Sequence, residues 1–411
     1  MNDVVVVGAG AAGLATAIFA RHLNPDRKVT LLDGAAQPGA KILVSGGSRC
    51  NVTNAIVSEH DYWGGKRTII RRVLKGLPVP ATIEFFRELG VNLKEEPNGK
   101  LFPTTDRSRD VLDGLLRGAH ESGVILASGT RVLDVTHLGD RLSIQTSQGP
   151  MTAASVVLAT GGLSLPKTGS DGGGLAIAGR LGHSIVPTTP ALAPLLLAPE
   201  WFHSQLSGVA HDAELTAWVA GRVTERIRGS MLWTHFGISG PVPLNASRVV
   251  LRAQLENHAV RLTANLFPPA RFESVDARWT AAATSRPRVT AQNALTEELP
   301  ASLAAALLAH AEIEGGTLLG ALSRNARRAL ARTLTELPLP VTASRGYNYA
   351  EATAGGVALD EIDPSSMASR KVPGLFLVGE MLDVDGRIGG FNFQWAWASA
   401  RVAAQGLALT F

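Results

Sequence analysis

One stretch, Val4–Asp33, constrains the fold of this chain more than any other part of its sequence. It starts with four consecutive valines, which are typical of a parallel strand buried on both faces. A turn in the G-x-G-x-x-G spacing follows, formed by Gly8, Gly10 and Gly13. After an apolar helical segment, a second strand over 28–32 ends in Asp33, where an acidic residue hydrogen-bonds a ribose hydroxyl. This order of elements predicts a dinucleotide-binding βαβ unit.

The residues of the turn have separate predicted roles. Gly8 allows the chain to turn sharply, Gly10 lets the backbone approach a pyrophosphate, and Gly13 lets the helix pack closely on the sheet. The helix is expected to run through Leu14 to about Leu23, and its free N–H groups would face the phosphates, with Ala11 and Ala12 as further candidate contacts. A strand–helix pair with coincidental glycines is the alternative, and the complete order of elements argues against it.

The run 4–20 carries no charge, so a membrane span or a signal peptide is an alternative reading. No basic residue precedes this run, no small-residue cleavage site follows it, and its glycines would weaken a spanning helix. No second apolar run reaches membrane length. We therefore expect a soluble, cytoplasmic protein without a membrane partner.

Composition narrows the function classes. A chain of 411 residues has room for two domains, and 45% hydrophobic against 18% charged residues supports a sizeable core. The net charge of +4 permits a local basic patch but does not require a nucleic-acid partner. Cys50 is the one cysteine, which excludes an internal disulfide and a redox dithiol, and with them disulfide-reductase chemistry.

Three further segments are expected near the glycine turn. Residues 37–54 are rich in Gly, Ser and Asn and predict a loop at the ligand-binding edge of the sheet. Its candidate cofactor contacts are Lys41, Arg49 and Asn51. Residues 154–162 predict a buried strand that ends in the candidate contacts Thr160 and Gly161. Short strands between 124 and 151 predict a meander, in which Val132 would offer backbone groups to an adenine ring.

The last part of the chain returns to the first pattern. Residues 374–386 predict a buried strand followed by a turn and by the acids Glu380 and Asp383. The candidate contacts here are Gly379, Glu380 and Asp383. A closing helix is expected to start near Gly390, Phe391 and Asn392, where its N-terminal dipole would face an anionic ring.

The middle of the chain differs from both ends, because prolines become frequent from Pro187 onward. We predict a discontinuous cofactor-binding domain of residues 1–187 and 345–411. Residues 188–344 would form an inserted substrate domain, which is β-rich over 188–270 and helical over 271–337. Strands are expected over 213–224 and 229–233.

Seven motifs follow one another along the chain: GAGAAG, SGGSRCNVTN, ATGG, TGSDGGG, THFGISGP, ATAGGV and VGEMLDVDGRIGGFNFQWAWAS. In this order the chain resembles the HI0933-like, or aminoacetone-oxidase-like, family of bacterial FAD-binding flavoproteins over nearly its whole length. The resemblance implies non-covalent FAD in a Rossmann-type, glutathione-reductase-like α/β domain built from both chain ends. It also implies an inserted domain with a β-rich part and a helical part. Ser48 replaces a glycine of the family's usual loop.

With FAD as the cofactor, the resemblance gives each candidate residue a role. The turn at 8–13 would hold the pyrophosphate and Asp33 the adenosine ribose. Glu380 and Asp383 would contact the ribityl–phosphate arm, and residues 390–392 would lie near the ring. The inserted domain would line the substrate pocket with Trp233, His235, Phe236 and Tyr347.

His235 is the candidate catalytic residue. Its imidazole titrates near neutrality and could accept a proton from the substrate. The alternative is that its two nitrogens tie the loop to the inserted domain. No metal site is expected.

Three functions remain open. The first is an FAD-dependent oxidoreductase that transfers a hydride between a small, amine-like metabolite and the flavin, which oxygen or another acceptor reoxidises. The second is an NAD(P)H-dependent flavin reductase of an unsaturated substrate, against which the lack of a second dinucleotide fingerprint counts.

The third function is a flavoprotein that binds or modifies RNA. Its candidate basic residues are Arg222, Arg226, Arg228, Arg324, Arg327 and Arg328. Because no aromatic residue is interleaved with these arginines in the sequence, we favour a solvated basic face. We expect a small-molecule substrate and no nucleic-acid partner, and the sequence leaves the oligomeric state open.

Overall fold

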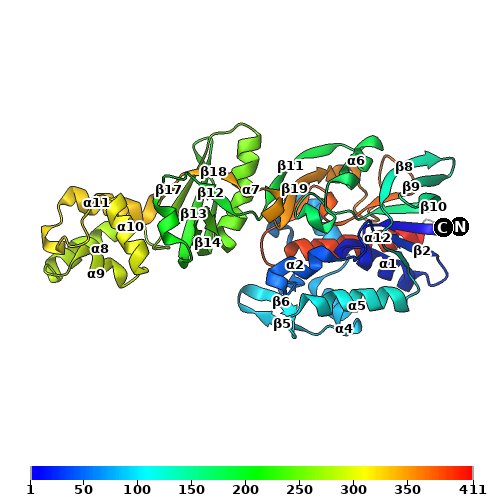
Figure 1. Ribbon diagram of the computed structural model, residues 1–411, viewed down its shortest axis with the longest axis horizontal. Coiled ribbons are helices and arrows are strands. Elements are labelled where there is room, and N and C mark those ends of the chain that lie inside the picture. The colour runs from blue at the N-terminus through cyan, green and yellow to red at the C-terminus, as the bar shows by residue number, and fades with distance from the viewer. Residues whose placement is uncertain (1, 410–411) are drawn as a thin grey trace. The chain divides into compact units, whose positions relative to one another are not determined.

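A computed structural model describes residues 2–409 (Figure 1). The chain divides into two compact units, which we call unit 1 and unit 2. Unit 1 comprises residues 1–190 and 350–411, and unit 2 comprises residues 191–349. The chain therefore leaves unit 1 once and returns to it.

Unit 1 is built on a seven-stranded sheet with the order β7-β2-β1-β10-β9-β8, in which β20 also pairs with β10. The parallel strands are β1 (Asn2–Val7), β2 (Val29–Leu32), β7 (Ile125–Ala127), β10 (Gly149–Leu158) and β20 (Leu375–Leu377). An antiparallel extension is formed by β8 (Val132–Leu138) and β9 (Arg141–Thr146). This is the Rossmann-type α/β architecture that the sequence predicts.

Strand β7 corrects one detail of the prediction. The sequence suggested that residues 124–126 open the antiparallel meander, but β7 pairs parallel with β2 at the edge of the sheet. The reason is the crossover before it, because helix α5 (Ser108–Glu121) carries the chain back so that β7 runs in the same direction as β2. The meander therefore starts only at β8.

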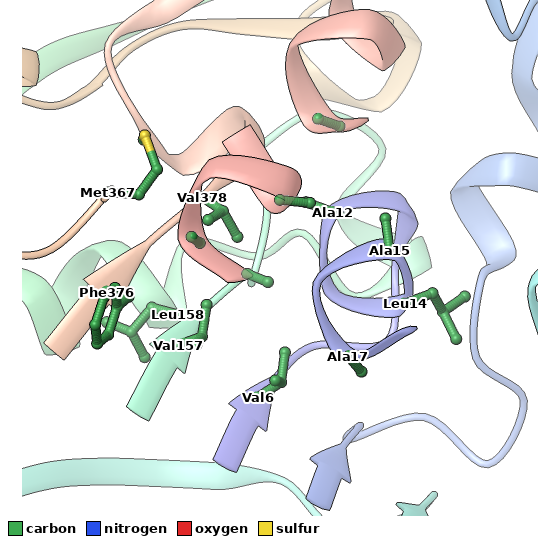
Figure 2. Packing of buried hydrophobic residues seen from close by; sticks show 14 of the residues in the cluster. Val6, Ala12, Leu14, Ala15, Ala17, Val157, Leu158, Met367, Phe376 and Val378 are labelled. Atoms are coloured by element: carbon green, nitrogen blue, oxygen red, sulfur yellow. The ribbon is translucent and has the colours of Figure 1, made fainter. Parts of the chain in front are cut away.

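Helices α1 (Ala11–Leu23) and α12 (Phe391–Leu409) pack against each other in the core of unit 1. Small residues such as Ala12 and Ala15 allow the close approach (Figure 2). Figure 2 also shows Val6 of β1, Val157 of β10 and Val378 after β20 in the same cluster. The first and last segments of the sequence thus share one core.

The sequence predicts a loop over residues 37–54, but part of this segment is helical. Helix α2 (Ala40–Ser48) begins after Gly39, and its regular geometry breaks at Ser45, Gly46 and Gly47, where both glycines have positive φ. Ala40, Lys41 and Leu43 are good helix formers, so the helix starts, and the glycines then bend the chain.

The remaining elements of unit 1 are short. The helices are α3 (Arg67–Leu74), α4 (Val79–Glu88) and α6 (Gly173–Arg180). A three-stranded sheet contains β3 (Thr53–Asn54), β5 (Leu93–Glu96) and β6 (Lys100–Pro103). Two strand pairs are β4 (Tyr62–Gly64) with β21 (Val384–Gly386) and β11 (Ile185–Ala191) with β19 (Ala352–Val357).

Unit 2 contains a seven-stranded antiparallel sheet with the order β17-β16-β13-β14-β15-β12-β18. Its strands are β12 (Leu195–Leu197), β13 (Ala210–Val219), β14 (Arg222–Thr234), β15 (Gly237–Ser239), β16 (Val260–Asn265), β17 (Leu337–Leu339) and β18 (Val341–Ser344). Its helices are α7 (Pro241–Leu255), α8 (Phe272–Ser285), α9 (Ala291–Thr296), α10 (Ala301–His310) and α11 (Arg324–Glu336).

The sequence predicts one strand over 213–224, but these residues span a hairpin, with the end of β13 and the start of β14 on either side of its turn. Ala220 and Gly221 both have positive φ, which suits the two-residue turn between β13 and β14. The apolar side chains of Ala213, Leu215 and Ala217 point to one face of the sheet and join the core that includes α7. Within residues 2–409, no helix is long and apolar enough to cross a membrane.

Candidate cofactor site

The three glycines of the first turn differ in what surrounds them. A Cβ at Gly8, where φ is +101°, would lie 2.6 Å from the Ala159 carbonyl oxygen, and one at Gly13 would lie 1.8 Å from the Gly8 oxygen. At Gly10, by contrast, φ is −84° and a Cβ would have no protein atom within 4 Å. The packing of the chain itself therefore requires Gly8 and Gly13 but not Gly10.

Gly10 is also the N-cap of α1, and no side chain caps this end of the helix. The first N–H groups of α1 are thus available beside open space. An anionic pyrophosphate fits this position, since it would satisfy those donors and interact favourably with the helix dipole. The site accordingly has the shape that a bound dinucleotide requires.

Asp33 lies beside this turn. One carboxylate oxygen accepts a hydrogen bond from the Ala9 N–H at 2.7 Å, and the other accepts one from the Ala35 N–H at 2.8 Å. The carbonyl oxygen of Asp33 accepts a bond from the Thr130 N–H at 2.8 Å, which brings the segment leading to Val132 alongside. Each carboxylate oxygen can still accept a second hydrogen bond, as contact with a ribose hydroxyl would require.

Lys41 and Glu380, predicted separately as cofactor contacts, form an ion pair with each other. Lys41 Nζ also donates to Ser164 Oγ at 2.5 Å. Glu380 Oε1 accepts hydrogen bonds from Ser164 Oγ at 2.6 Å and from Thr353 Oγ1 at 2.9 Å. The side chains of Lys41 and Glu380 are 24% and 17% exposed, so this polar cluster is only partly screened by solvent.

The sequence analysis missed Ser164 and Thr353. Thr353 Oγ1 accepts the N–H groups of Leu163 and Ser164, at 2.8 and 3.0 Å, and so fixes the chain just after Gly161. Both hydroxyl residues lie in or next to glycine-rich motifs, which is the signal that could have singled them out. Their partners lie far away in the sequence, so the contacts themselves could not be read from it.

Two buried polar atoms near the predicted cofactor segments have no hydrogen-bond partner among residues 2–409. They are Asn51 Oδ1 and Thr160 Oγ1. Thr160 is the second residue after β10, and its Cα would lie 3.2 Å from a Cβ on Gly8, so the strand end touches the glycine turn. Unpaired buried acceptors are costly in a finished site, and a bound cofactor with donor groups would relieve that cost.

Arg49 is paired with other side chains of the protein, and Cys50 is buried. Arg49 lies over the Phe102 ring at 4.0 Å and forms ion pairs with Glu96 at 2.7 Å and Asp106 at 3.4 Å. Its charge is therefore already balanced within the chain. Cys50 is fully buried, and burial raises the pKa of its thiol to about 12.

The C-terminal candidates mainly hold the site together. A Cβ at Gly379 would lie 2.8 Å from the Cβ of Ala12, so Gly379 packs directly on α1. Asn392 donates to and accepts from the backbone of Gly386, at 2.9 and 2.8 Å, and Phe391 is buried. The side chains of Asn392 and Phe391 are thus used within the protein.

The other two C-terminal candidates are also placed by close packing. A Cβ at Gly390 would lie 2.6 Å from backbone atoms of Thr53, and one at Gly64 would lie 2.2 Å from the Asp383 carbonyl oxygen. That oxygen accepts a hydrogen bond from the Gly65 N–H at 2.8 Å. Gly390 and Asp383 therefore fix backbone segments of the site.

In unit 2, His235 and Phe236 form the tip of the β14–β15 hairpin. The His235 side chain is exposed and has no hydrogen-bond partner within residues 2–409. We expected Trp233 to line the substrate pocket, but its side chain is not exposed. It is fully buried, and its Nε1 donates to His211 Nε2 at 2.9 Å. The described residues contain no cluster of three or more His, Cys, Asp or Glu that could hold a metal ion.

A Rossmann-type sheet with an open pyrophosphate position, to which the first and last segments of the chain both contribute, defines a dinucleotide-binding protein. The family model of the HI0933-like protein Rossmann domain matches residues 2–406, and the chain belongs to this family. The resemblance seen in the sequence is therefore confirmed.

Two relatives match along nearly the whole chain. One is a 3-dehydro-bile acid delta(4,6)-reductase of Clostridium scindens, which is 31% identical over 408 residues, or 99% of each chain. The other is a ribosomal RNA dihydrouridine synthase of Escherichia coli, which is 32% identical over 407 residues, or 98% of each chain.

Solved structures are similar in fold at low sequence identity. An E. coli quinol fumarate reductase has a TM-score of 0.52 at 16% identity, covering 99% of this chain and 70% of the other. A 3-ketosteroid delta1-dehydrogenase from Sterolibacterium denitrificans has a TM-score of 0.51 at 13% identity, covering 100% and 99%. At such identities the likeness concerns the fold alone.

Proposed function

We propose that this protein uses reduced FAD to saturate a ring carbon–carbon double bond that is conjugated with a carbonyl group. The support comes from what the names of the two full-length relatives have in common. A 3-dehydro bile acid with 4,6-double bonds and a uridine base both contain a C=C bond conjugated with a ketone or amide carbonyl. Each named reaction adds two hydrogen atoms across such a bond.

FAD, when bound in its reduced form, supplies a hydride to the β-carbon of the conjugated system. A proton then adds to the α-carbon, and the substrate gains two hydrogen atoms in total. A reductant of the NAD(P)H class would have to restore the flavin after each turnover. The sequence carries no second complete dinucleotide fingerprint for such a donor.

The residues of unit 1 would bind and orient this cofactor. The α1 N-terminus at Gly10 would hold the pyrophosphate, and Asp33 would accept a hydrogen bond from the ribose. Glu380 is held by Lys41, Ser164 and Thr353, so it is ready to accept bonds from ribityl hydroxyls. We infer non-covalent attachment, since the buried Cys50 thiol stays protonated at neutral pH and offers no thiolate.

The amine-oxidase reading from the sequence analysis has no support from these relatives, and we place it second. One experiment separates the two. The purified protein is reduced anaerobically by light and mixed with a 3-keto-4-ene steroid, with uridine or with a uridine-containing RNA, while the flavin absorbance is followed. We expect reoxidation by at least one conjugated substrate, and no bleaching of the oxidised protein by amines. Bleaching by an amine, with no reoxidation by any conjugated compound, would reject the proposal.

We propose His235 as the residue that exchanges a proton with the substrate. Its imidazole is exposed at a hairpin tip and makes no hydrogen bond within residues 2–409, so it is available to a substrate. The tethering alternative would need side-chain hydrogen bonds, and the described residues provide none. His235→Gln should slow the reductive step roughly 10²–10⁴-fold with FAD content unchanged. The control is His258→Gln, since His258 is 53% exposed in the same unit. An unchanged rate in the His235 variant would exclude the role.

A further inference from the structure

One face of the unit 2 sheet carries exposed arginines on neighbouring strands. Residues of β13 with odd numbers, such as Leu215, point toward the core with α7, so the even-numbered residues point to the opposite face. On that face the strand register places Arg228 of β14 beside Glu214, and Arg226 beside Thr216. Arg261 of β16 lies beside Trp218 in the same way.

The positive charge of this face is only partly balanced by the chain, since the exposed Asp212 of β13 points to the same side as Glu214. Arg226, Arg228 and Arg261 are exposed, and none of them forms an ion pair with a residue in the described range 2–409. Glu214, the acid in the middle of the face, is already paired with Arg271 at 2.9 Å. The face therefore has unpaired cations that a polyanion could neutralise.

Not all the arginines suspected from the sequence belong to this face. Arg327 and Arg328 of α11 lie 2.9 and 3.8 Å from the carboxylate of Asp276 on α8. Their charges hold two helices together. Arg324 is exposed on α11 rather than on the sheet, and it serves below as a control.

An aromatic ring lies among the cations. Trp218 is half-buried, its Nε1 donates to Thr263 Oγ1 at 3.3 Å, and the Arg261 guanidinium lies 4.6 Å from the ring centroid. The sequence argued against RNA because no aromatic residue is interleaved with the arginines along the chain. The strand register places an aromatic residue, Trp218 of β13, among the arginines of the neighbouring strands β14 and β16. The lack of aromatic residues along the sequence therefore no longer argues against RNA.

We propose that this face, centred on Trp218, Arg226, Arg228 and Arg261, binds a single-stranded segment of RNA. The proposal rests on the proposed function and deepens it, because the RNA would carry the base that is reduced. Alternate residues of one strand are about 7 Å apart, so Arg226 and Arg228 can contact different phosphates while a base stacks on Trp218. A steroid has at most one or two charges and needs an enclosed apolar surface, which an open basic face does not offer.

The test measures binding of the full-length FAD-loaded protein to a fluorescent, uridine-containing 12-residue RNA over a salt series. Arg226→Gln and Arg261→Gln should each weaken binding severalfold and reduce the salt slope by about one. Trp218→Ala should weaken binding by at least about fivefold, and Trp218→Phe should restore most of it, since stacking needs only a ring. Arg324→Gln should bind as the parent does. FAD content and melting temperature verify that each variant is folded.

The outcomes separate this proposal from the proposed function. Unchanged RNA affinity in the Trp218 and Arg226 variants would overturn the docking face, and so would equal binding of duplex RNA by the parent. The parent is also assayed with a free conjugated ketone and with uridine. If neither these nor the RNA reoxidise the reduced flavin, the proposed reaction fails, whatever the RNA affinity is.

Discussion

Gly10 and Gly13 form a matched pair of test positions, because only one of them is required by the fold. A Cβ at Gly13 would collide with the Gly8 carbonyl oxygen at 1.8 Å, while a Cβ at Gly10 would meet nothing within 4 Å. Gly10 also has a negative φ of −84°, so alanine can adopt its backbone conformation. Gly10→Ala should therefore leave the apoprotein intact and place a methyl group where the pyrophosphate would bind.

The expected magnitudes follow from these contacts. Alanine is a poorer N-cap than glycine, so Gly10→Ala should lower the free energy of unfolding of the apoprotein by at most about 1 kcal/mol. Its FAD dissociation constant should rise at least tenfold, which corresponds to about 1.4 kcal/mol of binding free energy. Gly13→Ala forces the helix away from the sheet, so it should cost about 1–3 kcal/mol or more of stability even without FAD.

The assay combines denaturant unfolding of the apoproteins with titration of FAD followed by quenching of its fluorescence. FAD also raises the melting temperature of a protein that binds it, and the rise should be smaller for Gly10→Ala than for the parent. The reasoning would be refuted if Gly10→Ala bound FAD with parental affinity. It would also be refuted if Gly10→Ala and Gly13→Ala lowered the free energy of unfolding of the apoprotein by the same amount, because a methyl group at position 10 would then clash with the protein.

Three further predictions concern single side chains. Asp33→Ala should weaken FAD binding by about 1.5–3 kcal/mol, since it removes both a ribose acceptor and the bond to the Ala9 N–H, and equal affinity would place Asp33 outside the site. The Cys50 thiol should resist alkylation until the protein unfolds, and Cys50→Ser should keep its FAD; a folded, FAD-loaded but inactive variant would contradict this. Burial raises the pKa of Glu361, but the hydrogen bonds from Lys371, Ser184 and His183 together outweigh it, and the pKa falls from 4.5 to about 2. A depressed carboxyl pKa stabilises the fold above the unfolded value and less as pH falls, so Glu361→Gln should flatten the loss of stability between about pH 4.5 and 2, and an unchanged pH profile would exclude this role.

The sequence by itself determined the Rossmann unit, because every signal for it is local. Four buried valines, a turn that needs glycine at Gly8 and Gly13, and an acid at the end of β2 all lie within Val4–Asp33. The hydrophobic periodicity of strands and helices, and the preference for glycine at positive φ, involve only a few neighbouring residues. They can therefore be recognised without knowing the rest of the chain. The hairpin at Ala220 and Gly221 was missed because it lacks a strong turn pair such as Asn-Gly.

Only the tertiary structure decided which polar side chains remain free for a ligand. Glu380 meets Lys41 across 339 residues of sequence and Thr353 across 27, and the charge of Arg49 is likewise taken up by Glu96. The ring of Trp218 comes to lie among the arginines in the same way, through the pairing of separate strands. A hydrogen bond or ion pair depends on a few ångströms of distance and on burial. Both are set by how distant segments pack, and a sequence motif contains no record of that packing.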